Sequence, residues 1–165
     1  MLSITVGCMY AGKTSKLMQN KPEGQTIIID YDRCEAPYVS TLYSHDNVNV
    51  DCIKTDDLSK LDMRIFDNIM INEAQFFKGL VPFVKMCLED SKHIYIYGLD
   101  GDFKQEKFGE ILDLIPLCDT YVKLYAKCIC GKDAPFSKRL SANQQQYLPN
   151  DTYRPSCRSC LTGNI

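Results

Sequence analysis

Short apolar runs recur along the first two thirds of the 165-residue chain. They are rich in Ile, Val and Tyr, a composition typical of strands that are buried in a sheet. We expect such strands at Leu2–Val6, Thr26–Asp30, Asn68–Ile71 and His93–Tyr97.

Helix-like stretches lie between these runs, at Lys13–Asn20, at Leu80–Asp90 and, more weakly, at Asp56–Met63. Strands that alternate with helices predict a parallel sheet with right-handed crossovers. The pattern therefore predicts an α/β domain over residues 1–127, in which helices flank a parallel sheet. After Lys127 it changes: Cys, Gly, Gln, Asn and Pro dominate, and no periodic segment follows.

Composition and charge narrow the classes of partner. The net charge is −2 and the pI is about 5.7, so the chain has no broad basic field and we expect no nucleic-acid partner. No stretch approaches the ~20 apolar residues that cross a bilayer, and no signal peptide opens the chain. We expect no membrane partner and a cytoplasmic location, where paired cysteines indicate metal more often than disulfides.

Residues 128–165 are expected to form a separate, loop-rich subdomain that is too small to be stabilised by burial alone. Two close cysteine pairs lie in it, Cys128/Cys130 and Cys157/Cys160, separated by 26 residues. Four thiolates form a closed tetrahedral zinc site of the structural type. Free or redox-active thiols are the alternative, although the close pairing favours metal.

The segment GCMYAGKT, residues 7–14, follows the first expected strand and reads G-x-x-x-x-G-K-[ST]. Its glycines let the backbone curl so that successive N–H groups point at one anion, and the following helix offers its positive end. Lys13 can reach the β- and γ-phosphates, and Thr14 can place its hydroxyl on Mg²⁺. A chance turn is the alternative, but the motif stands between a strand and a helix, as it must. We expect a site for Mg²⁺ and a nucleoside triphosphate at Gly7, Cys8, Met9, Tyr10, Ala11, Gly12, Lys13 and Thr14.

A second polar site follows the third expected strand, within FDNIMINEAQFF. In P-loop proteins a neighbouring strand ends in an acid that holds the Mg²⁺ shell; here Asn72 stands at that place, followed by Glu73. Glu73 is placed to accept a proton from an attacking hydroxyl or to orient a water molecule. An ordinary surface glutamate is the alternative.

Six further segments occur in a fixed order: NEAQFF, GLDGDF (98–103), LIPLCD (114–119), KLYAKC (123–128), FSKRL (136–140) and CRSC (157–160). Together they resemble the type II thymidine kinases, the cytosolic and viral-type family, over nearly the whole chain. The resemblance implies transfer of the γ-phosphate of ATP to the 5′-hydroxyl of thymidine, which gives thymidine monophosphate for DNA precursor salvage. It also implies a homo-oligomer, a dimer or a tetramer.

The resemblance also assigns roles to individual residues. Glu73 matches the catalytic base, Asp32 and Arg33 fall beside the phosphates, and Ser44-His45-Asp46 resembles the family's Thr-His-Asp, for which a loop-capping cluster is the alternative. Residues that match those enclosing the thymine ring are Met9, Phe76, Leu99 and Phe103, for which core packing is the alternative. The loop between the cysteine pairs is expected to cover the nucleoside, through Ser137, Gln145, Tyr147, Leu148 and Tyr153.

The chain departs from the family at several places. Asn72 replaces the family's Asp, one residue instead of two separates Cys128 from Cys130, and Leu148–Asp151 replaces a Gly-Gly pair. Asn72 keeps a carbonyl oxygen for the Mg²⁺ shell without the charge, which predicts an active enzyme with a raised Mg²⁺ requirement. It also raises an alternative function, a degenerate nucleotide-binding regulator with little turnover. A P-loop protein with a zinc ribbon acting on nucleic acid is a further alternative, opposed by the acidic pI.

Overall fold

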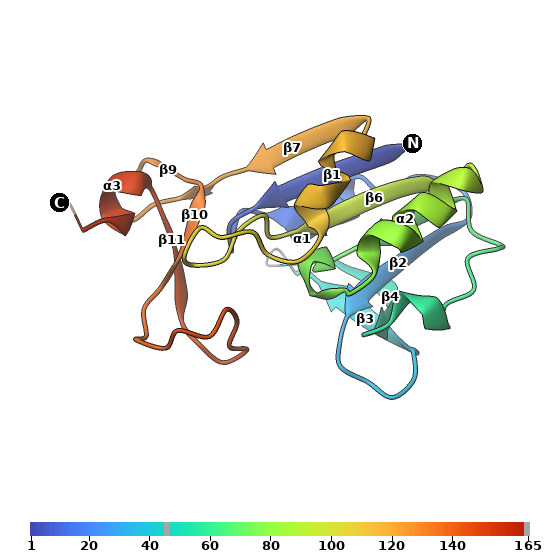
Figure 1. Cartoon of the computed structure of the whole chain (residues 1–165), viewed down its shortest axis with the longest axis horizontal. Coiled ribbons are helices and arrows are strands. Elements are labelled where there is room, and N and C mark those ends of the chain that lie inside the picture. Colours follow the sequence, from blue (N-terminus) through green and yellow to red (C-terminus); the bar gives the residue numbers. More distant parts are fainter. Residues whose placement is uncertain (45–46, 164–165) are drawn as a thin grey trace.

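The structure, a computed structural model, describes residues 1–44 and 47–163, and a seven-stranded sheet forms the centre of this part of the chain (Figure 1). The strand order is β3-β4-β2-β5-β6-β1-β7. Neighbouring strands are parallel except β3 and β4, which form an antiparallel pair at one edge. The strands are β1 (Leu2–Gly7), β2 (Thr26–Tyr31), β3 (Tyr38–Tyr43), β4 (Asn49–Thr55), β5 (Asn68–Ile71), β6 (His93–Gly98) and β7 (Thr120–Leu124).

Helices cover both faces of the sheet. On one face, Ile69 and Ile71 of β5 belong to the same buried cluster as Leu80 of α2 (Leu80–Glu89) and Ile111 of the 3-10 helix η3 (Ile111–Leu117). On the other face, Met70 packs with Leu17 of α1 (Lys13–Gln19). Successive residues of β5 thus point to opposite faces and both faces are buried, which explains the continuous apolar runs in the sequence. The predicted α/β fold is confirmed.

The predicted helix at Asp56–Met63 is wrong, because only the short 3-10 helix η1 (Leu58–Lys60) forms there. The Asp57 side chain accepts a hydrogen bond from the Ser59 backbone N–H, at 2.9 Å, and Asp62 does the same for Arg64, at 3.0 Å. Such local bonds compete with helix propagation. A second short 3-10 helix, η2 (Ala74–Phe76), directly follows β5.

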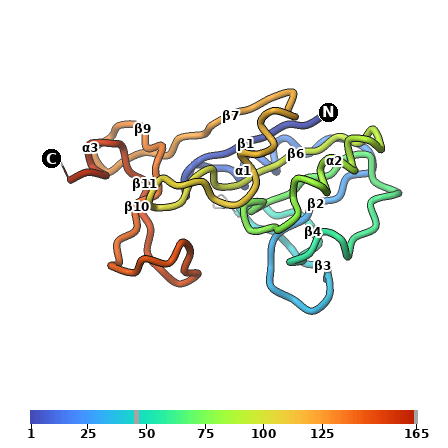
Figure 2. Tube along the Cα trace, in the orientation of Figure 1, coloured from blue at the N-terminus to red at the C-terminus, as the bar shows by residue number. Residues whose placement is uncertain are grey.

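The C-terminal segment contains more regular structure than its composition predicted. Two antiparallel strand pairs, β8 (Ala126–Lys127) with β9 (Asp133–Ala134) and β10 (Phe136–Arg139) with β11 (Tyr153–Ser156), precede α3 (Arg158–Leu161). These elements gather at one end of the seven-stranded sheet, and the loop that joins β10 to β11 projects from that strand pair (Figure 2). The sequence predicted a loop-rich subdomain and gave no sign of these short strands, because cross-strand pairing and not apolar periodicity forms them. Within the described residues, no helix combines the length and the apolar character needed to cross a membrane.

Candidate active site

A cavity of about 760 Å³ opens at the carboxyl ends of β1, β2, β5 and β6. This end of a parallel sheet is where α/β proteins bind ligands. The loops that follow these strands form one side of the cavity, and the loop between β10 and β11 forms the other. Its lining comprises Met9, Tyr10, Gly12, Lys13, Thr14, Ser15, Tyr31, Asp32, Arg33, Glu73, Gln75, Phe76, Leu99, Gln145, Tyr147, Leu148 and Pro149.

Most of the residues that sequence reasoning singled out lie in this lining. Among the residues expected to bind phosphate, Mg²⁺ or the nucleoside, those outside the lining are Gly7, Cys8, Ala11, Asn72, Phe103, Ser137 and Tyr153; Ser44 and the four paired cysteines also lie outside it. His45 and Asp46, from the Ser-His-Asp segment, lie outside the described residues.

The glycine-rich loop has the backbone shape that its sequence predicts. Gly12 adopts the left-handed conformation, with φ of 81°, at the start of α1, and Tyr10 does so with φ of 65°. A Cβ atom on Gly7 would lie 2.6 Å from the Leu124 carbonyl oxygen of β7, so only glycine fits there. Lys13 Nζ donates to the Cys8 carbonyl oxygen at 2.8 Å, which folds the side chain over its own loop. Burial lowers the pKa of Lys13, and the neighbouring Glu73 carboxylate partly opposes this effect.

The same loop is attached to the C-terminal segment. The Cys8 thiol donates to the Ala134 carbonyl oxygen at 3.0 Å, and the Met9 backbone N–H donates to Ser137 Oγ at 3.0 Å. Both Cys8 and Ser137 are buried. Ser137 therefore supports the loop from behind the cavity wall.

Glu73 is held by a neighbour that sequence reasoning did not single out. Gln75 Nε2 donates to Glu73 Oε2 at 2.6 Å, while Gln75 Oε1 accepts the backbone N–H of Leu99 at 2.9 Å. Because Oε1 must face the Leu99 donor, the amide can point only its nitrogen at Glu73. Glu73 itself has φ of 50°, an uncommon conformation for a residue with a side chain and one that clusters at functional sites.

Two glycines leave room for Gln75. A Cβ atom on Gly98 would lie 2.4 Å from Gln75 Oε1, and one on Gly109 would lie 2.1 Å from the Gln75 carbonyl oxygen. Gln75 is buried in this closely packed place. The sequence offered one sign that Gln75 has a role, its position in the NEAQFF segment. A glutamine in a sequence does not, however, reveal which carboxylate it binds.

Asn72 is buried at the end of β5, where its Nδ2 donates to Asp30 Oδ1 at 2.8 Å. Lys54 Nζ lies 3.4 Å from the other oxygen of Asp30, Oδ2. The amide nitrogen of Asn72 is thus hydrogen-bonded to Asp30. The side-chain oxygen of Asn72 is the atom that could accept a hydrogen bond from a water molecule bound to a metal ion. A buried carboxylate, Asp30, stands directly behind it.

Aromatic rings form another part of the cavity wall. Phe76 lies at their centre, with ring centroids 5.0 Å from Tyr31, 5.3 Å from Phe108 and 4.6 Å from Tyr147. Edge-to-face and tilted pairs of this kind are favourable beyond the area that they bury. They hold Phe76 in one orientation, as a flat apolar surface in the cavity. Nearby, Tyr38 Oη donates to Asp32 Oδ2 at 2.5 Å, which raises the pKa of Tyr38 to about 12.

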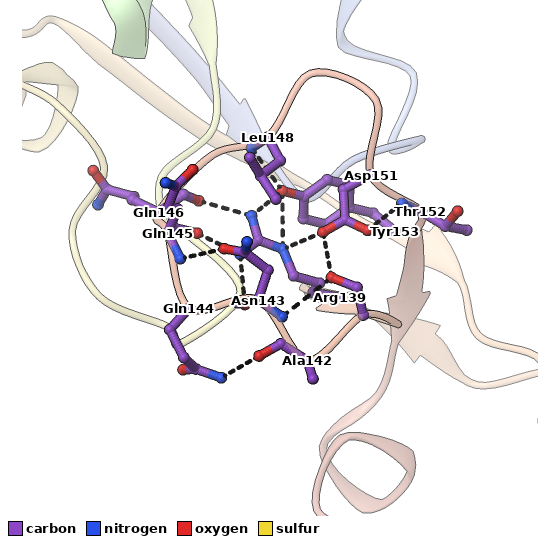
Figure 3. Close-up of polar contacts among 11 residues, drawn as sticks. Arg139, Ala142, Asn143, Gln144, Gln145, Gln146, Leu148, Asp151, Thr152 and Tyr153 are labelled. Carbon is purple, nitrogen blue, oxygen red and sulfur yellow. Dashed lines mark hydrogen bonds and ion pairs between the residues drawn. The ribbon is translucent and has the colours of Figure 1, made fainter.

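Arg139 organises the loop between β10 and β11, and sequence reasoning missed its role (Figure 3). Its guanidinium lies 4.0 Å from the ring centroid of Phe103 and 5.0 Å from that of Tyr153. Phe103 and Tyr153 therefore flank Arg139, behind the cavity lining. The loop also contacts the segment that follows β6, because Gln146 Nε2 donates to Asp102 Oδ2 at 3.0 Å.

The four paired cysteines converge at one point. The Sγ atoms of Cys128, Cys130, Cys157 and Cys160 all lie within 4.8 Å of one another, and those of Cys130 and Cys157 are 3.6 Å apart. Zn–S bonds of about 2.3 Å in a tetrahedron require S···S distances of about 3.8 Å, so the cluster fits zinc. Backbone N–H groups of Cys130 and Cys157 lower the pKa of Cys128 to about 6, which favours the thiolate that a metal binds. The single residue between Cys128 and Cys130 does not prevent either from reaching the cluster.

Comparisons with known proteins agree with the site. A family model described as thymidine kinase matches residues 1–161. The thymidine kinase of Sheeppox virus (strain KS-1) is 35% identical over 170 residues, 96% of this chain and 95% of the relative. That of Oryza sativa subsp. japonica is 36% identical over 182 residues, 99% of this chain and 67% of the relative. That of Vaccinia virus (strain Ankara) is 32% identical over 173 residues, 99% and 97% of the two chains. The chain therefore belongs to the thymidine kinase family and is, by that membership, an ATP-dependent kinase.

Proposed function

We propose that the chain transfers the γ-phosphate of ATP to the 5′-hydroxyl of thymidine and releases thymidine monophosphate and ADP. One observation carries this proposal: Lys13 of the glycine-rich loop and Glu73 line the same cavity, and an aromatic wall centred on Phe76 lines it too. The cavity thus has a place for phosphates, a base and a flat apolar surface for a ring. Family membership supports the same pairing of ATP with a nucleoside.

The phosphate half of the site would bind ATP through the loop at residues 7–14, with Asp32 and Arg33 beside it. Lys13 would leave the Cys8 carbonyl oxygen and extend to the β- and γ-phosphates. The Thr14 hydroxyl and the Asn72 carbonyl oxygen would hold Mg²⁺ and its water shell. Bound there, the ion would neutralise charge that develops on the phosphates.

Glu73 would act as the general base. It would accept the proton of the 5′-hydroxyl while that oxygen attacks the γ-phosphorus and the bond to the β–γ bridging oxygen breaks. Gln75 occupies Oε2 of Glu73, so Oε1 is the atom that would take the proton. General base catalysis typically contributes 10²–10⁴-fold.

The nucleoside half would hold thymine against Phe76, with Met9 and Leu99 beside the ring. Gln145, Tyr147 and Leu148 would close this half from the loop between β10 and β11, and Phe103, Ser137 and Tyr153 would support it from behind. Zinc at the four cysteines would maintain the C-terminal segment and take no part in the chemistry, because a closed site has no open position. We further propose a cytoplasmic, homo-oligomeric enzyme of DNA precursor salvage.

A specific observation favours a second candidate, a nucleotide-binding regulator with little turnover. Asn72 brings no charge to the metal shell, and its amide nitrogen is engaged by Asp30. ADP release with and without thymidine separates the two candidates. The proposed enzyme releases ADP only when thymidine is present, whereas a regulator binds ATP and releases little ADP whether or not thymidine is present.

A further inference from the structure

Arg139 is a charged residue in a buried place. Only 1% of its side chain is exposed. Burying a guanidinium is costly unless its donors are paired, so its partners must matter. Nη1 donates to the carbonyl oxygen of Asn143 at 3.0 Å and to that of Gln145, and Nη2 donates to that of Gln146 at 3.4 Å and to Tyr153 Oη.

The Asp151 carboxylate and the Tyr153 ring (Figure 3), together with the ring of Phe103, complete this environment. Arg139 Nε lies 2.9 Å from Asp151 Oδ2. The pKa of Asp151 is lowered, chiefly by a hydrogen bond that the Ser141 side chain donates to it. Phe103 and Tyr153 stack against the guanidinium. Stacking on aromatic faces together with several fixed donors is a combination that arginine supplies and lysine does not.

These contacts decide the shape of the loop. Residues 143–149 contain no helix or strand, yet Gln145, Tyr147, Leu148 and Pro149 line the cavity. Both backbone groups of Gln145 are engaged, since its N–H donates to Asn143 Oδ1 at 2.8 Å and its carbonyl oxygen accepts from Arg139. Gln145 therefore lines the cavity in an arrangement that Arg139 and Asn143 hold through its backbone.

We propose that Arg139 is a positioning residue for nucleoside binding, which prearranges residues 143–149 as a wall of the cavity through their backbone carbonyl groups. The proposal rests on the proposed function, in which this half of the cavity holds the nucleoside. Ordering a loop at the moment of binding costs affinity, and prearrangement removes that cost. The hydrogen bonds and ring contacts of Arg139 described above all lie within the C-terminal segment and at Phe103, so we expect ATP binding to depend on Arg139 much less than nucleoside binding does.

Steady-state kinetics of Arg139→Lys and Arg139→Met test this proposal. We expect KM for thymidine to rise by about tenfold or more, as for the loss of one or two charge-assisted bonds, while KM for ATP, kcat at saturating thymidine and zinc content stay near the wild-type values. Arg154→Lys is the matched control. Arg154 lies on β11 of the same hairpin, and its buried Nε has no hydrogen-bond partner within the described residues, so we expect lysine to lose no bond from that atom.

A rise in both KM values together, a loss of zinc, or an unchanged KM for thymidine would each overturn the proposal. If Arg139→Met fails to fold, Arg139→Lys decides, because lysine keeps a charge for Asp151. Limited chymotrypsin digestion without ligands gives a reading that is independent of thymidine turnover. Cleavage after Tyr147 should be faster in Arg139→Lys than in the wild type and in Arg154→Lys. Equal cleavage rates would contradict the prearranged loop even if the chain proved not to use thymidine.

Discussion

Glu73 is the residue on which the proposed chemistry depends. Replacing it by Gln keeps the size of the side chain and removes its basicity. We expect Glu73→Gln to lower kcat by 10²–10⁴-fold, the range of general base catalysis, while ATP still binds. ADP release and a separate ATP-binding titration measure the two effects. A variant that retains more than about a tenth of the wild-type rate would show that Glu73 is not the base.

Gln75 offers a test of how Glu73 is oriented. Gln75→Glu keeps an acceptor for the Leu99 N–H but loses the donor to Glu73, whereas Gln75→Met loses both. If Gln75 orients the base, both variants lose kcat, by about tenfold or more, with little change in KM for ATP. If it only supports the end of β6, Gln75→Glu should resemble the wild type. Gln25→Glu, an exposed position just before β2, controls for the added charge.

Asn72 connects metal binding to stability. Asn72→Asp places a second carboxylate beside Asp30, where a neutral amide now donates a hydrogen bond. We expect a lower melting temperature without ligands, because like charges repel, and a lower Mg²⁺ concentration for half-maximal rate. A difference of about 1–2 kcal/mol in metal affinity corresponds to roughly 5- to 30-fold. Superimposable Mg²⁺ titrations of the two proteins would contradict this account.

At the scale of elements, the cysteine cluster and the glycine-rich loop form one packed unit. Cys8 of the loop belongs to the same buried cluster as Cys128, Cys157 and Cys160. We therefore expect Cys157→Ser to lower zinc content from about one per chain and to weaken ATP binding together with it, since four-ligand sites contribute directly to folding. Metal analysis and an ATP titration on the same samples provide the test.

Cys118→Ser is the control for that experiment, because Cys118 lies outside the cluster, between η3 and β7. It should keep both zinc and ATP affinity. Full zinc content in Cys157→Ser would show that Cys157 is not needed for zinc binding. Zinc loss without any change in ATP affinity would show that the cluster does not support the glycine-rich loop.

The sequence predicts an element only where the element has a local pattern of apolar residues. The buried strands β1, β2, β5 and β6 are continuous apolar runs, so composition alone indicates them. The edge strands β3 and β7 are largely exposed and mixed in character, and pairing with one neighbour forms them. The short strands β8–β11 depend on contacts between distant residues, which no local pattern encodes.

At the scale of the whole molecule, the cavity unites segments that lie far apart in the chain. The glycine-rich loop and Glu73 could be predicted, because each directly follows a recognisable strand at one end of a parallel sheet. The roles of Gln75 and Arg139 could not, because they consist of hydrogen bonds to Glu73 and to loop carbonyl groups. Such roles depend on folded geometry. Phe103 and Tyr153 matched family positions, but only the structure places Arg139 against both rings.

The central claim is that the cavity transfers phosphate from ATP to a nucleoside. Its most direct test supplies ATP with isotopically labelled γ-phosphate, Mg²⁺ and thymidine to the full chain, and identifies the products by mass spectrometry. The account predicts label on the 5′-oxygen of thymidine, in amounts equal to the ADP formed and dependent on Glu73. Label that appears only as inorganic phosphate, or ADP formed equally without thymidine, would contradict it.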